Sequence, residues 1–124
     1  MQRKLQNGCF LKMPADDLDF ADNSFDSILC VEVLEHLDDA NEAIREIARV
    51  LKPKGKAVIA TPDYSKLLWH IAERFTAYKE EHITHFTRDS LESICREYGL
   101  VPIDYKYIAG CDLVELFEKE NPGV

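Results

Sequence analysis

The sequence predicts an α/β fold, and three observations lead to that prediction. Two short runs, Asp26–Val31 and Lys56–Ala60, are apolar without regular alternation, which is typical of strands covered on both faces, as in parallel sheets. A segment with the apolar spacing of a helix lies between them. The order strand, helix, strand predicts parallel strands joined by a right-handed crossover. The 124 residues are enough for one domain.

The segment ahead of the first apolar run carries weaker structural signals. Residues 1–8 look like the end of a helix that the dipeptide Asn7-Gly8 stops. Cys9–Met13 is a candidate short strand, and the acidic loop PADDLDFADNS follows it. We therefore expect one short strand and a polar loop before the first buried strand.

The helix between the two apolar runs has clear signals at both ends. Asp39 can cap its start, and Glu42 stands three residues later, where it would complete a capping box. Pro53 and Gly55 are expected to end the helix and to turn the chain back into the sheet. Its apolar stripe consists of Ile44, Ile47, Ala48 and Leu51.

The last third of the chain predicts two more helices and two further elements. Ser65–Tyr78 is helical by spacing and rich in aromatic residues. Thr87 caps the next helix, which Gly99 stops. Leu100–Ile108 alternates like a strand, and Asp112–Glu118 fits either a last strand or a short helix.

Composition excludes several classes of function. The net charge of −8 and the pI of about 4.9 argue against nonspecific binding of nucleic acid, which needs clustered Lys and Arg. No apolar run approaches the roughly 20 residues that cross a bilayer, and the first ten residues lack the core of a signal peptide. We expect a soluble, cytoplasmic protein with reduced thiols, because no CxxC pair occurs among Cys9, Cys30, Cys95 and Cys111.

Three ionisable residues follow the first buried strand. If the turn after Val31 is helical, Glu32, Glu35 and His36 fall at positions i, i+3 and i+4, which places them on one face. His36 would then be the best candidate for a catalytic general base, because its pKa lies near neutrality. The same three side chains could bind a divalent metal ion, or they could have a structural role only.

Three sequence blocks resemble known enzymes. FADNSFDSILCVEVLEHLDD, EIARVLKPKGKAVIATPD and EHITHFTRDSLESICREYGL are similar to motifs of the class I S-adenosylmethionine-dependent methyltransferases, especially the type 11 and ubiquinone-pathway members. The resemblance spans most of residues 14–100. It implies a partial Rossmann-like methyltransferase fold with a mostly parallel sheet and helices on both faces.

One family motif is missing from this chain. The glycine-rich loop that cradles the methionine part of S-adenosylmethionine has no counterpart, because the chain's glycines are Gly8, Gly55, Gly99, Gly110 and Gly123. The resemblance therefore implies a single, N-terminally truncated domain, residues 1–124, without the first two strands of the family. The strand Ser27–Val31 would be left with an open apolar edge, and such edges pair with other chains. We expect a homodimer or another oligomer through that edge, and no membrane partner.

The resemblance also implies which residues bind the cofactor. S-adenosylmethionine would contact the loop residues Ala15, Asp16 and Asp17 and the strand residues Cys30 and Val31. Many relatives carry Asp at the position of Pro14, so Asp16 or Asp17 would serve instead. The alternative is that the acidic loop is simply solvated.

A metal site is implied by a narrower resemblance. EVLEH followed by EHITHFT is similar to the arrangement in small-RNA 2′-O-methyltransferases, and ubiquinone-pathway O-methyltransferases carry a similar ExxEH. The ligands here would be Glu32, Glu35, His36 and His82, a set that suits Zn, Mn, Fe or Co better than Mg. Without a metal, His36 would only form a hydrogen bond, and Glu35 would only line the helix start.

The expected function is methyl transfer from S-adenosylmethionine to an unidentified small-molecule or RNA-ribose acceptor. Catalysis would fall to His36, Glu32 and Glu35, and an aromatic helix would cover the acceptor through Trp69, His70, Phe75 and Tyr78, unless these residues only pack. One alternative is a non-catalytic remnant of the fold that acts as a binding or assembly module. Another is a metal-binding module without methyl transfer.

Overall fold

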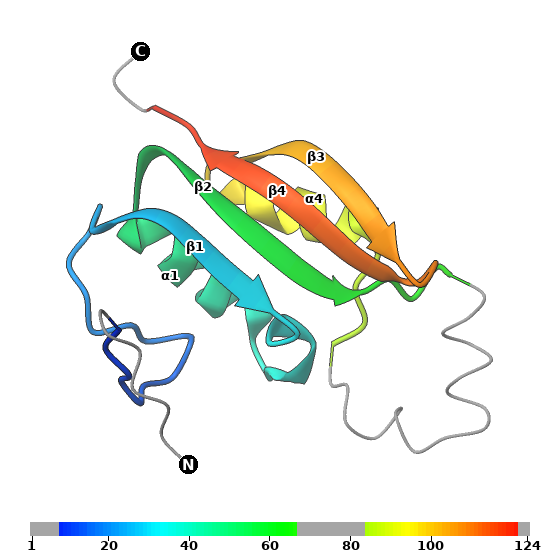
Figure 1. The fold of residues 1–124 in the computed structure, drawn as a ribbon, viewed down its shortest axis with the longest axis horizontal. Coiled ribbons are helices and arrows are strands. Elements are labelled where there is room, and N and C mark those ends of the chain that lie inside the picture. Colours follow the sequence, from blue (N-terminus) through cyan, green and yellow to red (C-terminus); the bar gives the residue numbers. More distant parts are fainter. Residues whose placement is uncertain (1–7, 67–83, 122–124) are drawn as a thin grey trace.

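The computed structural model describes residues 8–66 and 84–121, which form one mixed sheet with helices packed against it (Figure 1). Strand β1 (Phe25–Val31) lies at one edge, next to β2 (Leu51–Pro62), and these two strands are parallel. Strand β4 (Asp112–Lys119) pairs antiparallel with β2, and β3 (Leu100–Ile108) pairs antiparallel with β4 at the other edge. The order across the sheet is β1-β2-β4-β3.

The partial Rossmann-like fold is confirmed, although the sheet is less parallel than predicted. Of the three strand pairs among the described residues, one is parallel. A parallel pair needs a long crossover such as α1 (Ala40–Val50), whereas residues 109–111 join β3 to β4 directly. That short connection forces the hairpin to be antiparallel. The segment Asp112–Glu118, for which the sequence allowed a strand or a short helix, forms the strand β4.

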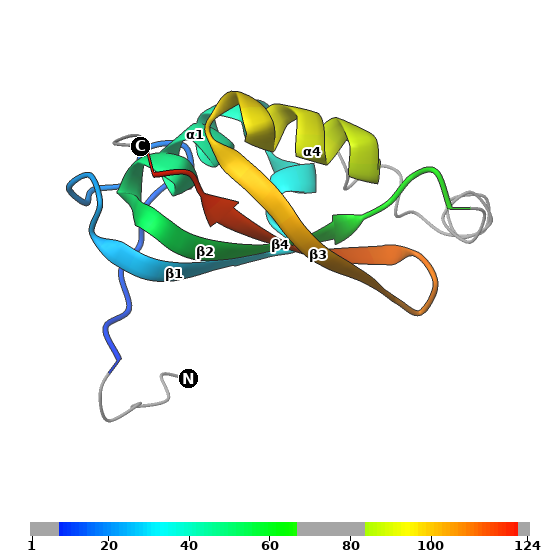
Figure 2. The same ribbon diagram turned by 90° about the horizontal axis from the view of Figure 1, so that it is seen from above.

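The described helices cover one face of the sheet. Helices α1 and α4 (Arg88–Glu97) lie on the same side in Figure 2, and the core fills the space between them and the strands. Helices on both faces were predicted, so this expectation is not met among the described residues. No described helix is long and apolar enough to cross a membrane.

The boundaries of α1 and β2 differ from the prediction. The Asp39 carboxylate caps α1 by accepting from the Asn41 N–H at 3.1 Å, but Glu42 pairs with Arg45 instead of completing a capping box. The helix ends at Val50, and β2 begins at once, so the predicted stop further on is wrong. Gly55 lies within β2, where a Cβ atom would approach the Lys52 carbonyl oxygen to 2.7 Å. The glycine is therefore needed for close packing of backbone rather than for a helix stop.

Of the other predicted elements, one is confirmed, one is wrong and two lie mostly outside the described residues. Thr87 caps α4, as predicted, and Ser90 completes a capping box with it. Cys9–Met13 is irregular and lies mostly exposed, because no neighbouring strand pairs with it among the described residues. The helix expected at residues 1–8 and most of the one expected at Ser65–Tyr78 lie outside the described residues.

Candidate functional site

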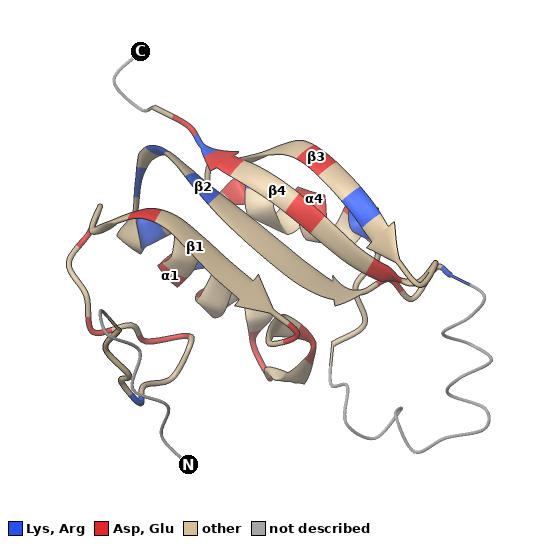
Figure 3. Ribbon diagram, viewed as in Figure 1, with Lys and Arg blue, Asp and Glu red and all other residues tan. Residues whose placement is uncertain are grey.

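The carboxyl ends of the two parallel strands, β1 and β2, lie side by side at one end of the sheet (Figure 1). Val31 pairs with Ala60 there, and Pro62 at the end of β2 pairs with Asp112 at the start of β4. Acidic residues gather just beyond β1 and ahead of α1 (Figure 3). Open α/β sheets bind their ligands at the carboxyl ends of parallel strands, so we take this end as the candidate site.

Glu32 is the first residue beyond β1, and its backbone turns the chain out of the sheet. Its φ angle is 56°, which non-glycine residues seldom adopt, while its N–H donates to the Ala60 carbonyl oxygen at 2.9 Å. The short 3-10 helix η1 (Leu34–His36) begins two residues later. The predicted turn with Glu32, Glu35 and His36 on one helical face is therefore wrong, because Glu32 is not part of the helix.

Glu35 points inward and is fully buried. Its Oε2 accepts a hydrogen bond from the Thr61 hydroxyl of β2 at 2.9 Å, whereas its Oε1 has no hydrogen-bond partner among the described residues. The exposed His36 ring places its Nε2 at 3.9 Å from that Oε1. The Glu35 carbonyl oxygen accepts from the Thr84 N–H at 3.0 Å, which ties η1 to the segment before α4. Through its side chain and its backbone, Glu35 thus connects η1 to β2 and to the segment before α4.

The two carboxyl groups of the site hold protons more strongly than ordinary glutamates. Partial desolvation, helped by the charges of Glu35 and Asp112, raises the pKa of Glu32 to about 7, although the residue is solvent-exposed. Burial also raises the pKa of Glu35, although the hydrogen bond from Thr61 opposes this shift. Glu32 can therefore exchange a proton near neutral pH, which is the property that a general acid or base requires.

A third carboxylate, Asp63, follows the end of β2 and was missed by the sequence analysis. It is buried and accepts from the Ser65 N–H and hydroxyl and from the Tyr107 hydroxyl, at 2.9, 2.6 and 2.7 Å. Burial acts to raise the pKa of Asp63, but these hydrogen bonds outweigh it and hold the pKa below its ordinary value. The sequence feature that could have identified Asp63 is its position directly after a buried strand. Beside it lies a cavity of about 340 Å³, lined by Asp63, Ser65, Lys66, Thr87, Arg88, Asp89 and Tyr107.

The two loops that border this cavity are held together by an aromatic stack. The Tyr64 ring lies on the His85 ring with 3.9 Å between centroids and 3° between planes. The Tyr64 N–H also donates to the Phe86 carbonyl oxygen at 2.8 Å. His85 thus stacks on the loop after β2. The candidate site therefore consists of the carboxyl ends of β1 and β2 and the segment before α4.

Comparison with known sequences identifies methyltransferases among the relatives of this chain. The family model described as a methyltransferase domain matches residues 1–59. Methyltransferase GfsG of Streptomyces halstedii is 39% identical over 99 residues, which are 80% of this chain and 33% of that protein. The ubiquinone/menaquinone biosynthesis C-methyltransferase UbiE of Geotalea daltonii is 37% identical over 73 residues, 59% of this chain and 27% of that one.

Solved structures give the same result for the fold. A S-adenosylmethionine-dependent methyltransferase from Thermotoga maritima superposes with a TM-score of 0.75 at 22% identity, over 89% of this chain and 63% of that one. A methyltransferase from Haloferax volcanii, solved with the Trm112 activator, gives 0.76 at 20% identity, over 90% and 62%. The chain resembles methyltransferase domains in sequence and shares their fold. It spans about a third of GfsG and less than two thirds of these two solved chains.

Methyltransferases of this family use S-adenosylmethionine. The five residues predicted to contact it differ from one another in burial and in the face they point to. Ala15 packs against the core, whereas Asp16 and Asp17 are exposed in a turn. Cys30 faces the helices, and burial raises the pKa of its thiol to about 11, so it stays protonated. Val31 points to the opposite face and is exposed. The five cofactor contacts stay a prediction, because Cys30 and Val31 lie on opposite faces of β1 and no described segment is glycine-rich.

The loop with the predicted cofactor residues is anchored by Arg49, which the sequence analysis did not single out. Its guanidinium donates to the carbonyl oxygens of Phe20 and Leu18 at 2.7 and 2.9 Å. Glu46, one turn earlier on α1, accepts from the Leu18 N–H at 2.8 Å and from Arg49 itself. The hydrogen bond from Arg49 lowers the pKa of Glu46 to about 2, so the pair stays ionised and the loop stays fixed to α1.

The predicted metal site stays a prediction. Within residues 8–66 and 84–121, no three His, Cys, Asp or Glu side chains lie in an arrangement that could hold a metal ion. The fourth predicted ligand, His82, lies outside the described residues, as do the residues of the predicted acceptor cover, Trp69, His70, Phe75 and Tyr78.

Proposed function

We propose that this chain carries the acceptor side of an S-adenosylmethionine-dependent methyltransferase site that acts on a small molecule. The observation that supports it most is the carboxyl pair of Glu32 and Glu35 at the adjoining ends of β1 and β2, in a chain that resembles methyltransferase domains. Bound S-adenosylmethionine supplies an electrophilic methyl group and becomes S-adenosylhomocysteine after transfer. The residues of this chain would position the acceptor and take up its proton.

Glu32 is suited to accept the acceptor's proton. A pKa of about 7 leaves a large fraction of the carboxyl groups ionised at neutral pH and still makes them competent bases. Glu35 would act as a positioning residue, because it is buried and fixes η1 through Thr61 and the backbone of Thr84. His36 stays a second candidate base, since its ring is exposed beside Glu35.

A small acceptor fits this chain better than an RNA ribose. Acidic residues surround the site, and the whole chain carries a net charge of −8. Phosphate groups of RNA would be repelled by such a surface, because nucleic-acid binding depends on neutralisation by Lys and Arg. The relative UbiE is named a ubiquinone/menaquinone biosynthesis C-methyltransferase, which supports a small organic acceptor.

The test is methyl transfer from labelled S-adenosylmethionine to a panel of phenols and hydroquinones, measured from pH 5 to 9. Glu32→Gln is expected to lower the rate by about 10²–10⁴-fold and to remove the rise in rate near pH 7. His36→Asn should leave that rise in place, and Asp38→Asn, which changes a neighbouring exposed carboxylate, is the matched control.

The competing function is a non-catalytic binding or assembly module of the same fold. Its supporting feature is the lack of a glycine-rich sequence. Calorimetric titration with S-adenosylhomocysteine discriminates the two. If neither the chain nor its assembly with a second polypeptide binds it, the methyltransferase proposal is wrong.

A further inference from the structure

A polar cavity outside the candidate site lies between α4 and the edge strand β3. Its volume is about 250 Å³, and α4 lines it with Arg88, Glu92 and Arg96. These residues recur at every fourth position, so they form one stripe along the helix. Strand β4 contributes Glu115 to the lining. The cavity beside Asp63 shares only Arg88 with this one, so the two are separate places for a ligand.

Glu115 forms the buried end of this cavity. The residue is 1% exposed, whereas the other lining residues are partly or fully exposed, and its Oε1 has no hydrogen-bond partner among the described residues. Burial, followed by the contact with Glu92, raises the pKa of Glu115 to about 9. The two carboxyl groups therefore hold one proton between them at neutral pH. The unpaired oxygen costs free energy, which a ligand that donates to it would recover.

Two guanidinium groups border the same cavity, and they are engaged to different extents. Arg88 is held by Glu92 at 3.2 Å and lies 4.0 Å over the Tyr105 ring. Arg96 is exposed, and its guanidinium has no hydrogen-bond or ion-pair partner within the described part of the chain. Its charge still acts on Glu115, whose pKa it lowers. Arg96 is thus the cation that is available to an anionic group in the cavity.

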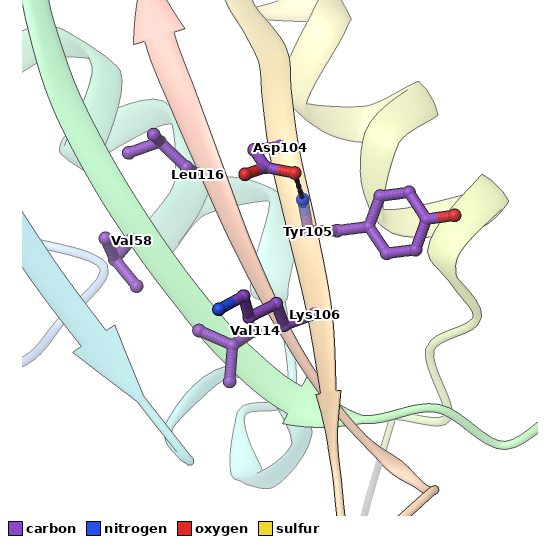
Figure 4. A pocket seen from close by; sticks show the side chains of 6 residues that line it. All are labelled: Val58, Asp104, Tyr105, Lys106, Val114 and Leu116. Atoms are coloured by element: carbon purple, nitrogen blue, oxygen red, sulfur yellow. Dashed lines mark hydrogen bonds between the residues drawn. The ribbon is translucent and has the colours of Figure 1, made fainter.

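The wall on the side of β3 is apolar and aromatic. Pro102 and Ile103 line it, and the Tyr105 ring points from β3 toward α4 (Figure 4). Asp104 points the other way, toward Leu116, and accepts from the Tyr105 N–H at 2.8 Å. Its carboxylate is therefore turned away from the buried carboxyl pair. The pairing with β4 shifts register between Pro102 and Asp104, and such irregularities often re-aim side chains beside binding sites.

The remaining neighbours of Glu115 add no charge. Burial raises the pKa of the Cys95 thiol on α4, so this group stays neutral. On β2 the pairing partner of Glu115 is Ile59, and on β3 it is Tyr105. The proton balance in the cavity therefore depends on the two glutamates and the two arginines.

We propose that this cavity binds a free α-amino acid with an apolar side chain. The ammonium group of the ligand donates to Oε1 of Glu115 and to Glu92. Its carboxylate pairs with Arg96, because guanidinium–carboxylate hydrogen bonds are among the strong ones in proteins. The side chain lies against the apolar wall formed by Pro102 and Ile103. Such binding is independent of methyl transfer, since it uses none of the residues assigned to the acceptor or its proton.

Simpler ligands leave part of the cavity unmatched. An anion alone pairs with Arg96 but leaves Oε1 of Glu115 without a donor. An amine alone satisfies the carboxyl pair but leaves Arg96 without a partner. A metal ion is disfavoured by the two adjacent guanidinium groups, which repel a cation. An amino acid carries both required groups a short distance apart.

Binding should displace the proton that the two glutamates share. The ammonium group supplies the positive charge and the hydrogen-bond donors in place of that proton, so both carboxyl groups become ionised. The O–H bond of Glu115 breaks, and the proton passes to the buffer. A ligand that releases a proton binds more tightly as the proton concentration falls. The affinity should therefore rise between pH 6 and pH 8, by up to about tenfold per pH unit.

Isothermal titration calorimetry with L-leucine tests the proposal, because titrations in two buffers of different ionisation enthalpy count the released protons. We expect about one proton per leucine at pH 7. Glu115→Gln should abolish the release and weaken binding at least about tenfold. Arg96→Gln should weaken binding to a similar extent but keep the release. Glu118→Gln on the same strand and Arg45→Gln on α1 are the matched controls and should change neither quantity.

The analogues that lack one charged group complete the test. Isocaproate, which has no amino group, and isoamylamine, which has no carboxylate, should each bind at least about tenfold more weakly than leucine. Equal binding of isocaproate would mean that the arginines bind any small anion, and the proposal would be wrong. Absence of leucine binding by the wild-type chain would overturn it as well. Leucine binding that is unaffected by both Glu115→Gln and Arg96→Gln would place the ligand elsewhere, with the same consequence.

Discussion

Two of the glutamates that the structure describes are fully buried, and their surroundings differ. Glu35 lies at the candidate site with a hydroxyl donor, Thr61, on one oxygen. Glu115 lies on β4 under α4, 1% exposed, and faces a second carboxyl group, that of Glu92. Each has one side-chain oxygen without a hydrogen-bond partner in the described part of the chain. The comparison shows that equal burial leads to different chemistry, depending on whether the neighbour donates a hydrogen bond or competes for a proton.

The buried Glu115 carboxyl group keeps its proton and shares it with Glu92 through a hydrogen bond. Burial, followed by the contact with Glu92, raises the pKa of Glu115 to about 9, while Arg88 and Arg96 oppose the shift. Arg88 is itself held by Glu92 at 3.2 Å and lies 4.0 Å over the Tyr105 ring. This pair is not at the ends of the parallel strands, so we assign it no role in methyl transfer.

The largest expected effect is that of Glu115→Gln on stability at alkaline pH. Above pH 4.5 the unfolded state ionises while the folded state keeps its proton up to about pH 9, so the wild type loses stability as pH rises through this window. Glutamine stays neutral and can donate to Glu92. The free energy of unfolding should rise by roughly 2–4 kcal/mol at pH 8 and change little at pH 4.

Urea unfolding at both pH values measures this difference. Glu118→Gln is the control, because Glu118 lies on the same strand but is only half-buried and pairs with Lys56. An equal effect of Glu115→Gln at pH 4 and pH 8 would contradict the shared proton.

A smaller effect is expected when the donor of the other glutamate is removed. Thr61→Val preserves the shape of the side chain but removes the hydroxyl that donates to Glu35. The free energy of unfolding should fall by about 1–2 kcal/mol at pH 7, because a buried hydrogen bond is lost. The pKa of Glu35 should rise further, so the loss should be smaller at pH 4, where the carboxyl group is protonated in both states.

Carbon-detected NMR of the Glu35 carboxyl group follows its protonation, and Ser27→Ala, which removes an exposed hydroxyl from β1, is the control. An unchanged titration in Thr61→Val would mean that this hydrogen bond does not govern Glu35.

Sequence patterns predicted what depends on local chemistry and failed where distant segments decide. The strand at Asp26–Val31 and the cap at Thr87 were predictable, because apolar runs and capping residues act over a few positions. The helical turn at Glu32 was wrong, since a hydrogen bond to the neighbouring strand holds its backbone in the left-handed region. Glu115 was not noticed, because its partner Glu92 is 23 positions away and meets it only after α4 docks on the sheet.

The smallest expected effect tests whether the N-terminal cap of α4 is independent of the proton shared between Glu92 and Glu115. Thr87 caps α4, and its hydroxyl accepts from the Ser90 N–H at 3.2 Å. Thr87→Ala should lower the free energy of unfolding by about 1 kcal/mol, as the loss of a cap usually does, whereas Thr87→Ser should restore it. The loss should be the same at pH 4 and pH 8, because the cap is uncharged. A loss that grows with pH would instead mean that the helix start controls the distance between Glu92 and Glu115, and the two features of α4 could no longer be treated as independent.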